Sequence, residues 1–436
     1  MTLSFDHASR QWQIAGEPIQ LDYLTSLADG QAINTLVAGL FLLEDAKQIE
    51  RQLITGSLLV TTDQNVAKKL FFSGCAVLTY QERYYVVETR SYPGRSIGQP
   101  DTEKTIRGAK DGFNENLIMN VGLIRRRIRH EALVMQIMSI GRVSQMDVCL
   151  CYMEDRVNAK LLDTIRSRLV NLQVEEVTMS DRAIEELLVD QGFHPFPLVR
   201  YCERPDIVAA EVIKGHIALV VDTTSSVILL PIHLCDLLEH VQEHRETPLI
   251  GTMIRLIRMM AILLSIYLVP LWLSVIQNPQ LSRMFFLRPP EGEVLSLGLQ
   301  VFIAEGAIEL LRLATIYTPS ELSSAMGLVA ALLLGQMAID LGVFLPEVLL
   351  YIAISNVAGF ATPSYELSLA NKLVKWGMIL ATLVAGKYGL ATFHFLFLSY
   401  LMHLDRFHSF YAYPLVPFDG RALMHFIFRL PKKSPS

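Results

Sequence analysis

The chain has 436 residues, of which 51% are hydrophobic and only 19% are charged, and its formal net charge is −5. Residues 251–436 hold 13 basic and 10 acidic residues, so of the totals of 38 and 43 the first 250 residues hold 25 and 33. This distribution predicts an acidic, water-exposed part followed by a membrane-embedded part, and it argues against nucleic acid as the main partner.

Three other classes of protein are disfavoured. The N-terminal sequence has no basic stretch followed by an apolar run, so no secretory signal peptide is expected. All five cysteines precede residue 251 and none forms a CxxC pair, which favours a reduced, cytosolic compartment over a disulfide or zinc framework. The sequence has no Walker loop, GxSxG, HExxH or kinase signature. We therefore expect no enzyme, no catalytic residues, no metal and no cofactor.

The first predicted subdomain covers residues 1–106. Amphipathic helices are predicted over 34–52 and 63–72. The β-rich runs 74–80 and 83–89, joined by a short polar turn, are typical of a hairpin.

Residues 107–145 are predicted to form a connecting helix region, because Leu117, Val121, Ile124 and Ile128 fall on one helical face. A second subdomain is predicted over 146–250, where strands alternate with helices and end in a hairpin. This alternation predicts the α/β class for both subdomains of a soluble head.

A weak internal repeat links the two predicted subdomains. Each contains a helix, a glycine (Gly74 or Gly215), a strand, a short turn and a second strand. A glycine at this place is typical of a helix C-terminus. The repeat indicates either two related subdomains or a chance similarity between common patterns.

Residues 251–436 are predicted to form a helical transmembrane domain. Apolar segments of the length that a bilayer requires are 259–276, 323–343, 346–360 and 373–404. The last is long enough for two crossings, and a turn at Gly386–Gly389 keeps Lys387 out of the middle of the bilayer.

The charges flanking these segments predict their orientation. Arg255 and Arg258 precede the first segment and the C-terminal tail is basic, which places both ends of the domain in the cytoplasm and requires an even number of crossings. The segment 295–313 supplies a sixth crossing or is re-entrant or interfacial, since three charged residues lie on one of its faces: Glu305, Glu309 and Arg312. The sequence thus predicts four to six spans.

Two groups of residues in these segments are candidates for a pore or for helix packing. Gly327, Ala331 and Gly335 form a stripe of small residues, which allows close packing within one subunit or between subunits. Gln336 and Asp340 continue the same segment with polar groups that face a cavity or partner, or lie at the interface. Ser355 and Asn356 mark either a broken helix at an ion site or a polar helix contact.

Four long motifs resemble the GerA family, the A subunits of endospore germinant receptors: GRSIGQPDTEKTIRGAKDGFNENLIMNVGLIRRRIR, PFPLVRYCERPD, GHIALVVDTTSSVILLP and AIELLRLATIYTPSELSSAMGLVAALLLGQMAI. They lie in the same order along residues 90–436, and several are more similar to the SpoVAF branch than to nutrient-receptor A subunits. Six polar residues of the head motifs are interpreted as structural: Arg107, Asp111, Glu203, Arg204, Asp206 and Asp222.

The resemblance implies a cytosolic head on a multi-span domain in the spore inner membrane. It implies homo-oligomers that conduct ions, with other germination membrane proteins or a small membrane partner beside them, acting in or amplifying germination signalling. A secondary transporter and a non-conducting membrane scaffold are the alternative functions.

Overall fold

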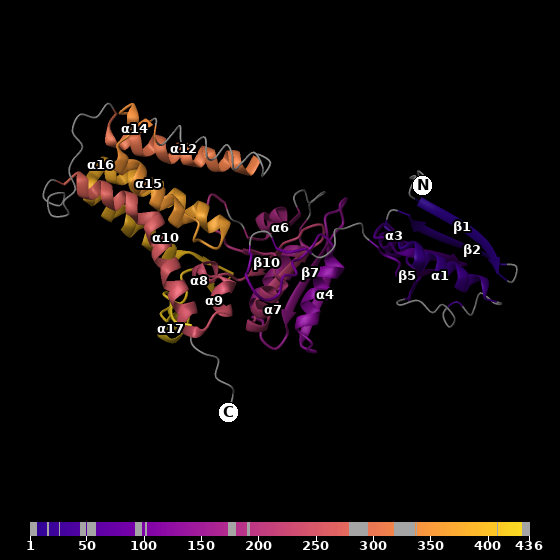
Figure 1. The fold of residues 1–436 in the computed structure, drawn as a ribbon. Coiled ribbons are helices and arrows are strands. Elements are labelled where there is room, and N and C mark those ends of the chain that lie inside the picture. Colours follow the sequence, from indigo (N-terminus) through magenta and orange to yellow (C-terminus); the bar gives the residue numbers. More distant parts are fainter. Residues whose placement is uncertain are drawn as a thin grey trace. The chain divides into compact units, whose positions relative to one another are not determined.

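A computed structural model of the chain forms two compact units, Met1–Ser96 and Ile97–Ser436, and each is described by itself (Figure 1). The described residues are 7–14, 17–25, 27–43, 49, 58–91, 98–100, 103–172, 180–189, 192–278, 295–317, 336, 338–407 and 409–429.

The first unit contains one antiparallel sheet with the strand order β1-β2-β4-β5-β3. Its strands are β1 (His7–Ile14), β2 (Glu17–Leu24), β3 (Leu58–Thr61), β4 (Ala76–Tyr80) and β5 (Arg83–Val87). Helix α1 (Gly30–Phe41) packs on one face of this sheet and α3 (Gln64–Phe72) on the other. The hairpin predicted over 74–89 is confirmed as β4 and β5.

The helices of the first unit begin at side-chain caps. The predicted helix over 63–72 is confirmed as α3, where the carboxylate of Asp63 accepts a hydrogen bond from the Asn65 amide at 2.8 Å. Helix α1 begins earlier than predicted, because Asp29 caps it through the Gln31 amide at 3.0 Å. A carboxylate at this position satisfies an amide that has no partner within the helix.

The second unit begins with another five-stranded sheet, of order β6-β7-β9-β10-β8. Its elements are α4 (Leu117–Arg127), β6 (Leu133–Ile140), β7 (Met146–Met153), α5 (Ala159–Val170), α6 (Ser180–Val189), β8 (Arg200–Cys202), α7 (Pro205–Lys214), β9 (Ile217–Val221) and β10 (Val227–Leu230). Side chains that alternate along β7 and β9 enter two different cores. Helices α4 and α7 cover one face of the sheet, and α5 and α6 cover the other.

The predicted α/β class needs a correction, because all strand pairs of the described residues in both sheets are antiparallel. Half of these pairs have a local reason: short connections join β1 to β2, β4 to β5, β6 to β7 and β9 to β10, and a short connection permits only antiparallel pairing. The two sheets have the same order when their strands are numbered within each subdomain. Two related subdomains would have this shared order, and their relationship stays a prediction.

The region 107–145 contains less helix than predicted. Helix α4 ends at Arg127, and the chain then enters β6, which pairs with β7 along its whole length. The helix begins at Leu117, where the Asn116 side chain caps it by accepting from the Met119 amide at 3.1 Å.

The remaining elements of the second unit are mainly helices. They are α8 (Leu234–Leu238), α9 (Val241–Arg245), α10 (Pro248–Ile276), α12 (Leu297–Tyr317), α14 (Ala338–Asp340), α15 (Pro346–Gly359), α16 (Tyr365–His403) and α17 (Gly420–Ile427), with a two-stranded sheet of β11 (Asp405–Arg406) and β12 (Ser409–Phe410). Among the described residues, α10 and α16 are long and apolar enough to cross a membrane, and α15 is a shorter apolar helix.

Helix α16 is a hairpin of two helical halves, which confirms the turn predicted at Gly386–Gly389. The backbone leaves the helical region at Ala385 and Gly386, and Gly386 has a φ of 60°. A Cβ built on Gly377 would lie 2.4 Å from the ring of Phe393, so the second half returns along the first.

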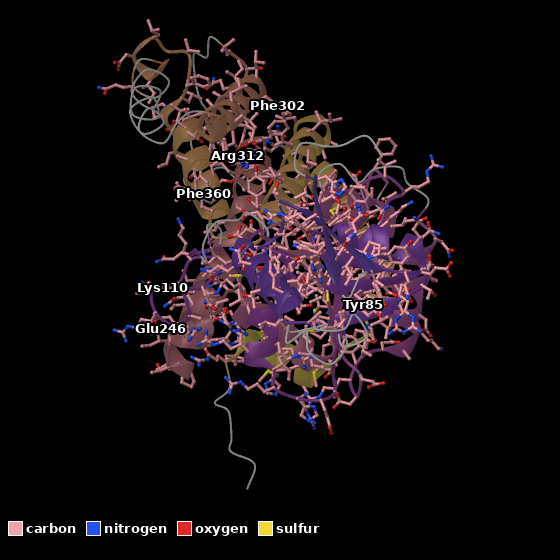
Figure 2. All side chains as sticks on the ribbon, turned by 90° about the vertical axis from the view of Figure 1, so that its right-hand side faces the viewer. Tyr85, Lys110, Glu246, Phe302, Arg312 and Phe360 are labelled. Atoms are coloured by element: carbon pink, nitrogen blue, oxygen red, sulfur yellow. The ribbon has the colours of Figure 1, made fainter. Side chains whose placement is uncertain are left out.

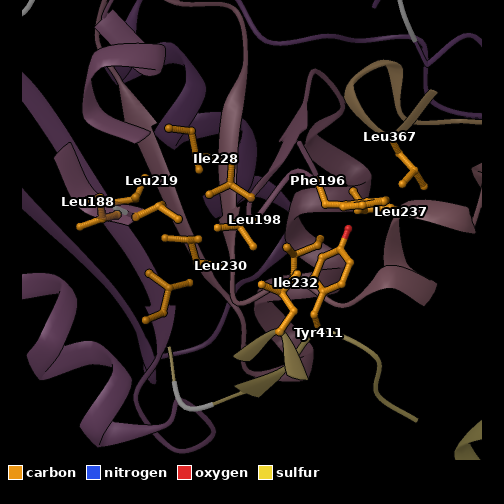
Figure 3. Close-up of a cluster of buried hydrophobic side chains, with 14 of the residues drawn as sticks. Leu188, Phe196, Leu198, Leu219, Ile228, Leu230, Ile232, Leu237, Leu367 and Tyr411 are labelled. Atoms are coloured by element: carbon orange, nitrogen blue, oxygen red, sulfur yellow. The ribbon is translucent and has the colours of Figure 1, made fainter. Parts of the chain in front are cut away.

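The core of the second sheet continues into these helices. Leu219, Ile228 and Leu230 of the sheet belong to the same buried cluster as Leu367 of α16 and Tyr411 (Figure 3). The second subdomain and the base of the helices therefore share one hydrophobic core.

Candidate functional site: a buried charged network between four helices

A pair of opposite charges is buried between α12 and α16. Glu305 is 3% exposed and Lys375 is 2% exposed. The Nζ of Lys375 lies 2.8 Å from Oε1 of Glu305. Burial removes the hydration of both ions, and their mutual attraction offsets that cost. Removing either ion would leave the other buried without a counter-ion.

Polar side chains of α10 and α15 extend this pair. Ser355 donates a hydrogen bond to the Ser265 carbonyl at 2.9 Å, and Lys375 lies 3.4 Å from the Ser355 hydroxyl. The amide nitrogen of Asn356 lies 3.4 Å from Oε2 of Glu305 and donates to the Ile352 carbonyl at 2.9 Å. The network thereby connects all four helices.

A second charged group follows one turn along α12. Glu309 Oε2 lies 2.5 Å from the Nζ of Lys372, and Glu309 also forms an ion pair with Arg312. The Arg312 guanidinium lies over the ring of Tyr365, 5.6 Å from its centroid. Figure 2 labels Phe302 and Arg312, which mark the course of α12.

These contacts set the direction of the helices. Glu305 meets Lys375 and Glu309 meets Lys372, so α12 runs antiparallel to the first half of α16. Carboxylates four apart on one helix match lysines three apart on the other, because both spacings place side chains on one helical face.

A cavity of about 10 Å³ lies inside the network. It is lined by Ser265, Ser355, Asn356, Gly359, Thr362, Ser368, Asn371, Lys372 and Lys375. The hydroxyl oxygen of Thr362, a residue that is 9% exposed, is buried here without a hydrogen-bond partner among the residues that the structure describes. The cavity has room for about one water molecule, which would satisfy that hydroxyl.

This arrangement can do two things chemically. It can hold the four helices in one register, because sliding one helix would separate buried opposite charges. It can also offer polar groups to water or an ion in a region that is otherwise apolar, as ionisable residues at membrane depth do in transport pathways.

Comparison with known proteins identifies the family. Residues 1–435 match the family described as Bacillus/Clostridium GerA spore germination protein. The chain belongs to the GerA family. The prediction that it is not an enzyme is confirmed, because this family consists of germinant receptor subunits.

Two relatives and one solved structure illustrate the range of similarity. The chain is 36% identical over 444 residues to Stage V sporulation protein AF of Bacillus subtilis (strain 168), covering 99% of the chain and 90% of the relative. It is 26% identical over 395 residues to the uncharacterized membrane protein YfkQ of the same organism, covering 89% and 77%. A crystal structure of the N-terminal domain of the A subunit of the Bacillus megaterium spore germinant receptor GerK3 matches at 24% identity, with coverage of 52% and 88% and a TM-score of 0.23.

The structure brings together only some of the membrane residues singled out in this GerA-family sequence. Ser355 and Asn356 lie in the network. Gln336 and Asp340 are exposed, and Asp340 ends the short helix α14. The small-residue stripe, Gly327, Ala331 and Gly335, lies outside the described residues, so its role in packing or in a pore stays a prediction.

Sequence reasoning missed the centre of the network. Glu305 and Glu309 are visible as carboxylates on one face of a segment that was predicted to be a sixth crossing, re-entrant or interfacial, and Lys375 was only part of an apolar run. The signal that could have found the pairing is the complementary spacing of two acidic residues in one apolar segment and two lysines in another.

In the head, Arg204 of the family motif ERPD is 1% exposed and joins two segments of the chain. Its guanidinium contacts both carboxylate oxygens of Asp206 at 3.0 and 2.9 Å. It also donates to the Glu103 carbonyl at 3.1 Å, the Thr105 hydroxyl at 3.0 Å and the Ala109 carbonyl at 3.0 Å.

Burial acts to raise the pKa of Asp206, but the hydrogen bonds and charge of Arg204 outweigh it, and the pKa lies below its ordinary value. Arg245 adds to this, with its guanidinium 2.8 Å from Asp206. The cluster can therefore hold its charges at neutral pH.

The other head residues lie around this cluster. Asp111 forms an ion pair with Arg127 at 2.6 Å, and the carboxylate of Asp222 accepts from the Leu117 amide at 3.1 Å at the start of α4. The Glu203 carbonyl accepts from the Phe113 amide at 2.9 Å, and Arg107 is exposed.

The two arginines that were predicted to flank the first span lie inside a helix and are buried. Arg255 and Arg258 are buried and contact Glu243, which is 0% exposed, at 2.7 and 2.5 Å. Arg255 also donates to the His425 carbonyl at 3.1 Å, before the end of α17. The reason is that α10 begins at Pro248, before the predicted span, so both arginines lie inside the helix and against α9.

Proposed function

We propose that the chain is a subunit of an oligomeric ion-conducting channel in the spore inner membrane, which acts in or amplifies germination signalling with its head in the cytosol. The buried network around Glu305 and Lys375 carries the proposal. Charged groups are costly in an apolar helix set, and a structural role alone would be served equally well by apolar packing.

The exposed sides of the helices support placement in a bilayer or against further copies of the chain. Leu350, Ile354 and Val357 of α15 are 57%, 43% and 68% exposed, and Leu380 and Val384 of α16 are 55% and 81% exposed. Apolar side chains at this density favour lipid or protein contact over water.

The proposal is tested by reconstituting the purified chain in liposomes and measuring ion flux. The informative variant is the double substitution Glu305→Gln/Lys375→Met, because it removes both charges together and leaves no unpaired ion. We expect flux from the parent chain and a loss of about tenfold or more in the double variant, since the polar path is interrupted.

The matched control is Lys387→Met, which removes a lysine of the same helix that is exposed and contacts the ring of Tyr388. Its flux should equal that of the parent. Saturable solute uptake would indicate a secondary transporter instead, and silence of the parent chain in the presence of other germination membrane proteins would indicate a scaffold.

A further inference from the structure

A cavity of about 560 Å³ lies where the second subdomain meets the start of α16. One wall comes from α6 and β8, with Asp181, Glu185 and Tyr201, and another from the residues Pro363–Leu369. Its volume falls within the range of small-molecule sites. None of the residues that line the small cavity inside the buried charged network lines this one, although Tyr365 of its wall also contacts Arg312 at the end of that network.

The charge of the cavity wall is negative. Five carboxylates line it, those of Glu103, Asp181, Glu185, Glu203 and Glu366, against the guanidiniums of two arginines, Arg182 and Arg200. Both arginines are already in ion pairs, Arg182 with Glu185 at 2.5 Å and Arg200 with Glu103 at 3.0 Å. Five negative and two positive charges leave an excess of three negative charges, so a ligand should be a cation.

The arrangement of the carboxylates in the cavity favours an organic cation over a metal ion as the ligand. Among the residues that the structure describes, no three Asp, Glu, His or Cys side chains are placed to hold a metal ion together. The walls between the carboxylates are apolar or aromatic, from Pro195, Pro197, Leu237 and Leu369. We propose that this cavity binds a small organic cation, an ammonium or guanidinium group on an apolar body.

The same geometry places the ligand between two elements that are far apart in the sequence. Glu185 lies on α6 of the head, and Glu366 lies in the first turn of α16. Burial raises the pKa of Glu185, its bonds to Tyr201 and Arg182 oppose this, and the charge of Glu366 raises it further. A bound cation relieves this repulsion and holds the start of α16 on the head.

The proposal is tested on the full chain in detergent by calorimetric titration with three probes of nearly equal shape. The probes are phenethylammonium, neutral 2-phenylethanol and anionic phenylacetate. We expect phenethylammonium to bind and to raise the unfolding temperature, and the neutral and anionic probes to bind at least about tenfold more weakly, a difference of about 1.4 kcal/mol.

Two variants locate the site. Asp181→Asn and Glu366→Gln should each weaken phenethylammonium binding by about tenfold, because each removes one carboxylate and keeps its shape. Asp163→Asn is the matched control: Asp163 is exposed on α5 and does not line the cavity. A control that loses as much affinity, or equal binding of phenylacetate, would overturn the proposal.

This inference does not depend on conduction. Binding is measured without ion flux, so its failure leaves the channel proposal standing, and a silent channel leaves the binding site testable.

Discussion

At the scale of single residues, the Glu305–Lys375 pair makes the strongest prediction about stability. Lys375→Met leaves the carboxylate of Glu305 buried without its counter-ion, which should lower the free energy of unfolding in detergent by about 3–5 kcal/mol. Chemical unfolding followed by tryptophan fluorescence measures the change.

The double variant Glu305→Gln/Lys375→Met should recover most of this loss, because no unpaired charge remains. Lys387→Met, at an exposed position, should stay within about 0.5 kcal/mol of the parent. Equal stability of the single and double variants would show that water reaches Glu305 and that the network is not a dry ion pair.

We expect substitution of Arg204 to lower the stability of the head by a comparable amount. Arg204→Ala removes the three hydrogen bonds from the start of α7 to residues 103–109, and we expect a loss of about 3–5 kcal/mol in the full chain. Arg204→Lys should recover little, because one ammonium cannot replace a planar group that bonds in several directions. Exposed Arg129→Ala is the control. Unchanged stability with lost germination activity would instead indicate a functional contact for Arg204.

The pKa of His216 leads to a prediction of how the stability of the second subdomain depends on pH. Burial lowers its pKa below the ordinary 6.5, although the charges of Glu211 and Asp236 oppose this, while Lys214 and His233 add to the lowering. As the pH falls below 6.5, the unfolded chain binds the proton first, so stability present above that pH is lost. The unfolding temperature should fall between about pH 7.5 and about pH 5.5, and His216→Asn should reduce that fall. A fall of the same size in the variant would assign the dependence to other groups, such as His240, whose pKa burial also lowers.

At the scale of elements, the turn inside α16 depends on a glycine. Gly386 has φ 60° and ψ −141°, a conformation that is strained for any residue with a Cβ. Gly386→Ala should destabilise the chain by about 1–3 kcal/mol, as measured by unfolding in detergent. Gly306→Ala is the control, because a Cβ there meets nothing within 4 Å and the substitution favours a helix. If both variants are equally stable, the hairpin does not depend on this backbone conformation.

The sequence predicted elements better than their pairing. The hairpin of β4 and β5 and the turn of α16 were predicted because glycines and short polar turns act locally. The antiparallel sheets were not, because helices alternating with strands are compatible with either direction of pairing. The strand β6 was read as helix, since its pairing with β7 depends on a distant partner rather than on its own periodicity.

The candidate site was also only partly predictable, because its contacts join residues that are distant in the sequence. Ser355 and Asn356 were predictable as polar residues in an apolar segment, which always need a partner. The partners themselves, Glu305 and Lys375, lie 70 residues apart, and only the antiparallel packing of α12 on α16 brings them together.

At the scale of the whole molecule, contacts within the second unit show which segments lie at each end of the helices α10, α12, α15 and α16. Gln277 lies beside Gly386 at one end, while Arg312 meets Tyr365 at the other. Leu345 donates to the Gln300 side chain at 2.9 Å, so the start of α15 lies beside the first turn of α12. The second half of α16 then returns to the second subdomain, where the ring centroids of Tyr400 and His194 are 5.7 Å apart.

This order makes a prediction about sidedness. The second subdomain and α17 share one end, because α10 follows that subdomain directly and its Arg255 contacts the His425 carbonyl, and Lys387 marks the opposite end. In a chain whose native cysteines are replaced, Lys387→Cys should react with a membrane-impermeant maleimide in sealed cells, and Arg421→Cys should react only after permeabilisation. Both positions are exposed, so a difference between them reports the membrane rather than burial. Reaction at Arg421→Cys in sealed cells would place the head outside the cytoplasm, and reaction at neither position would mean that Lys387 does not reach the far side.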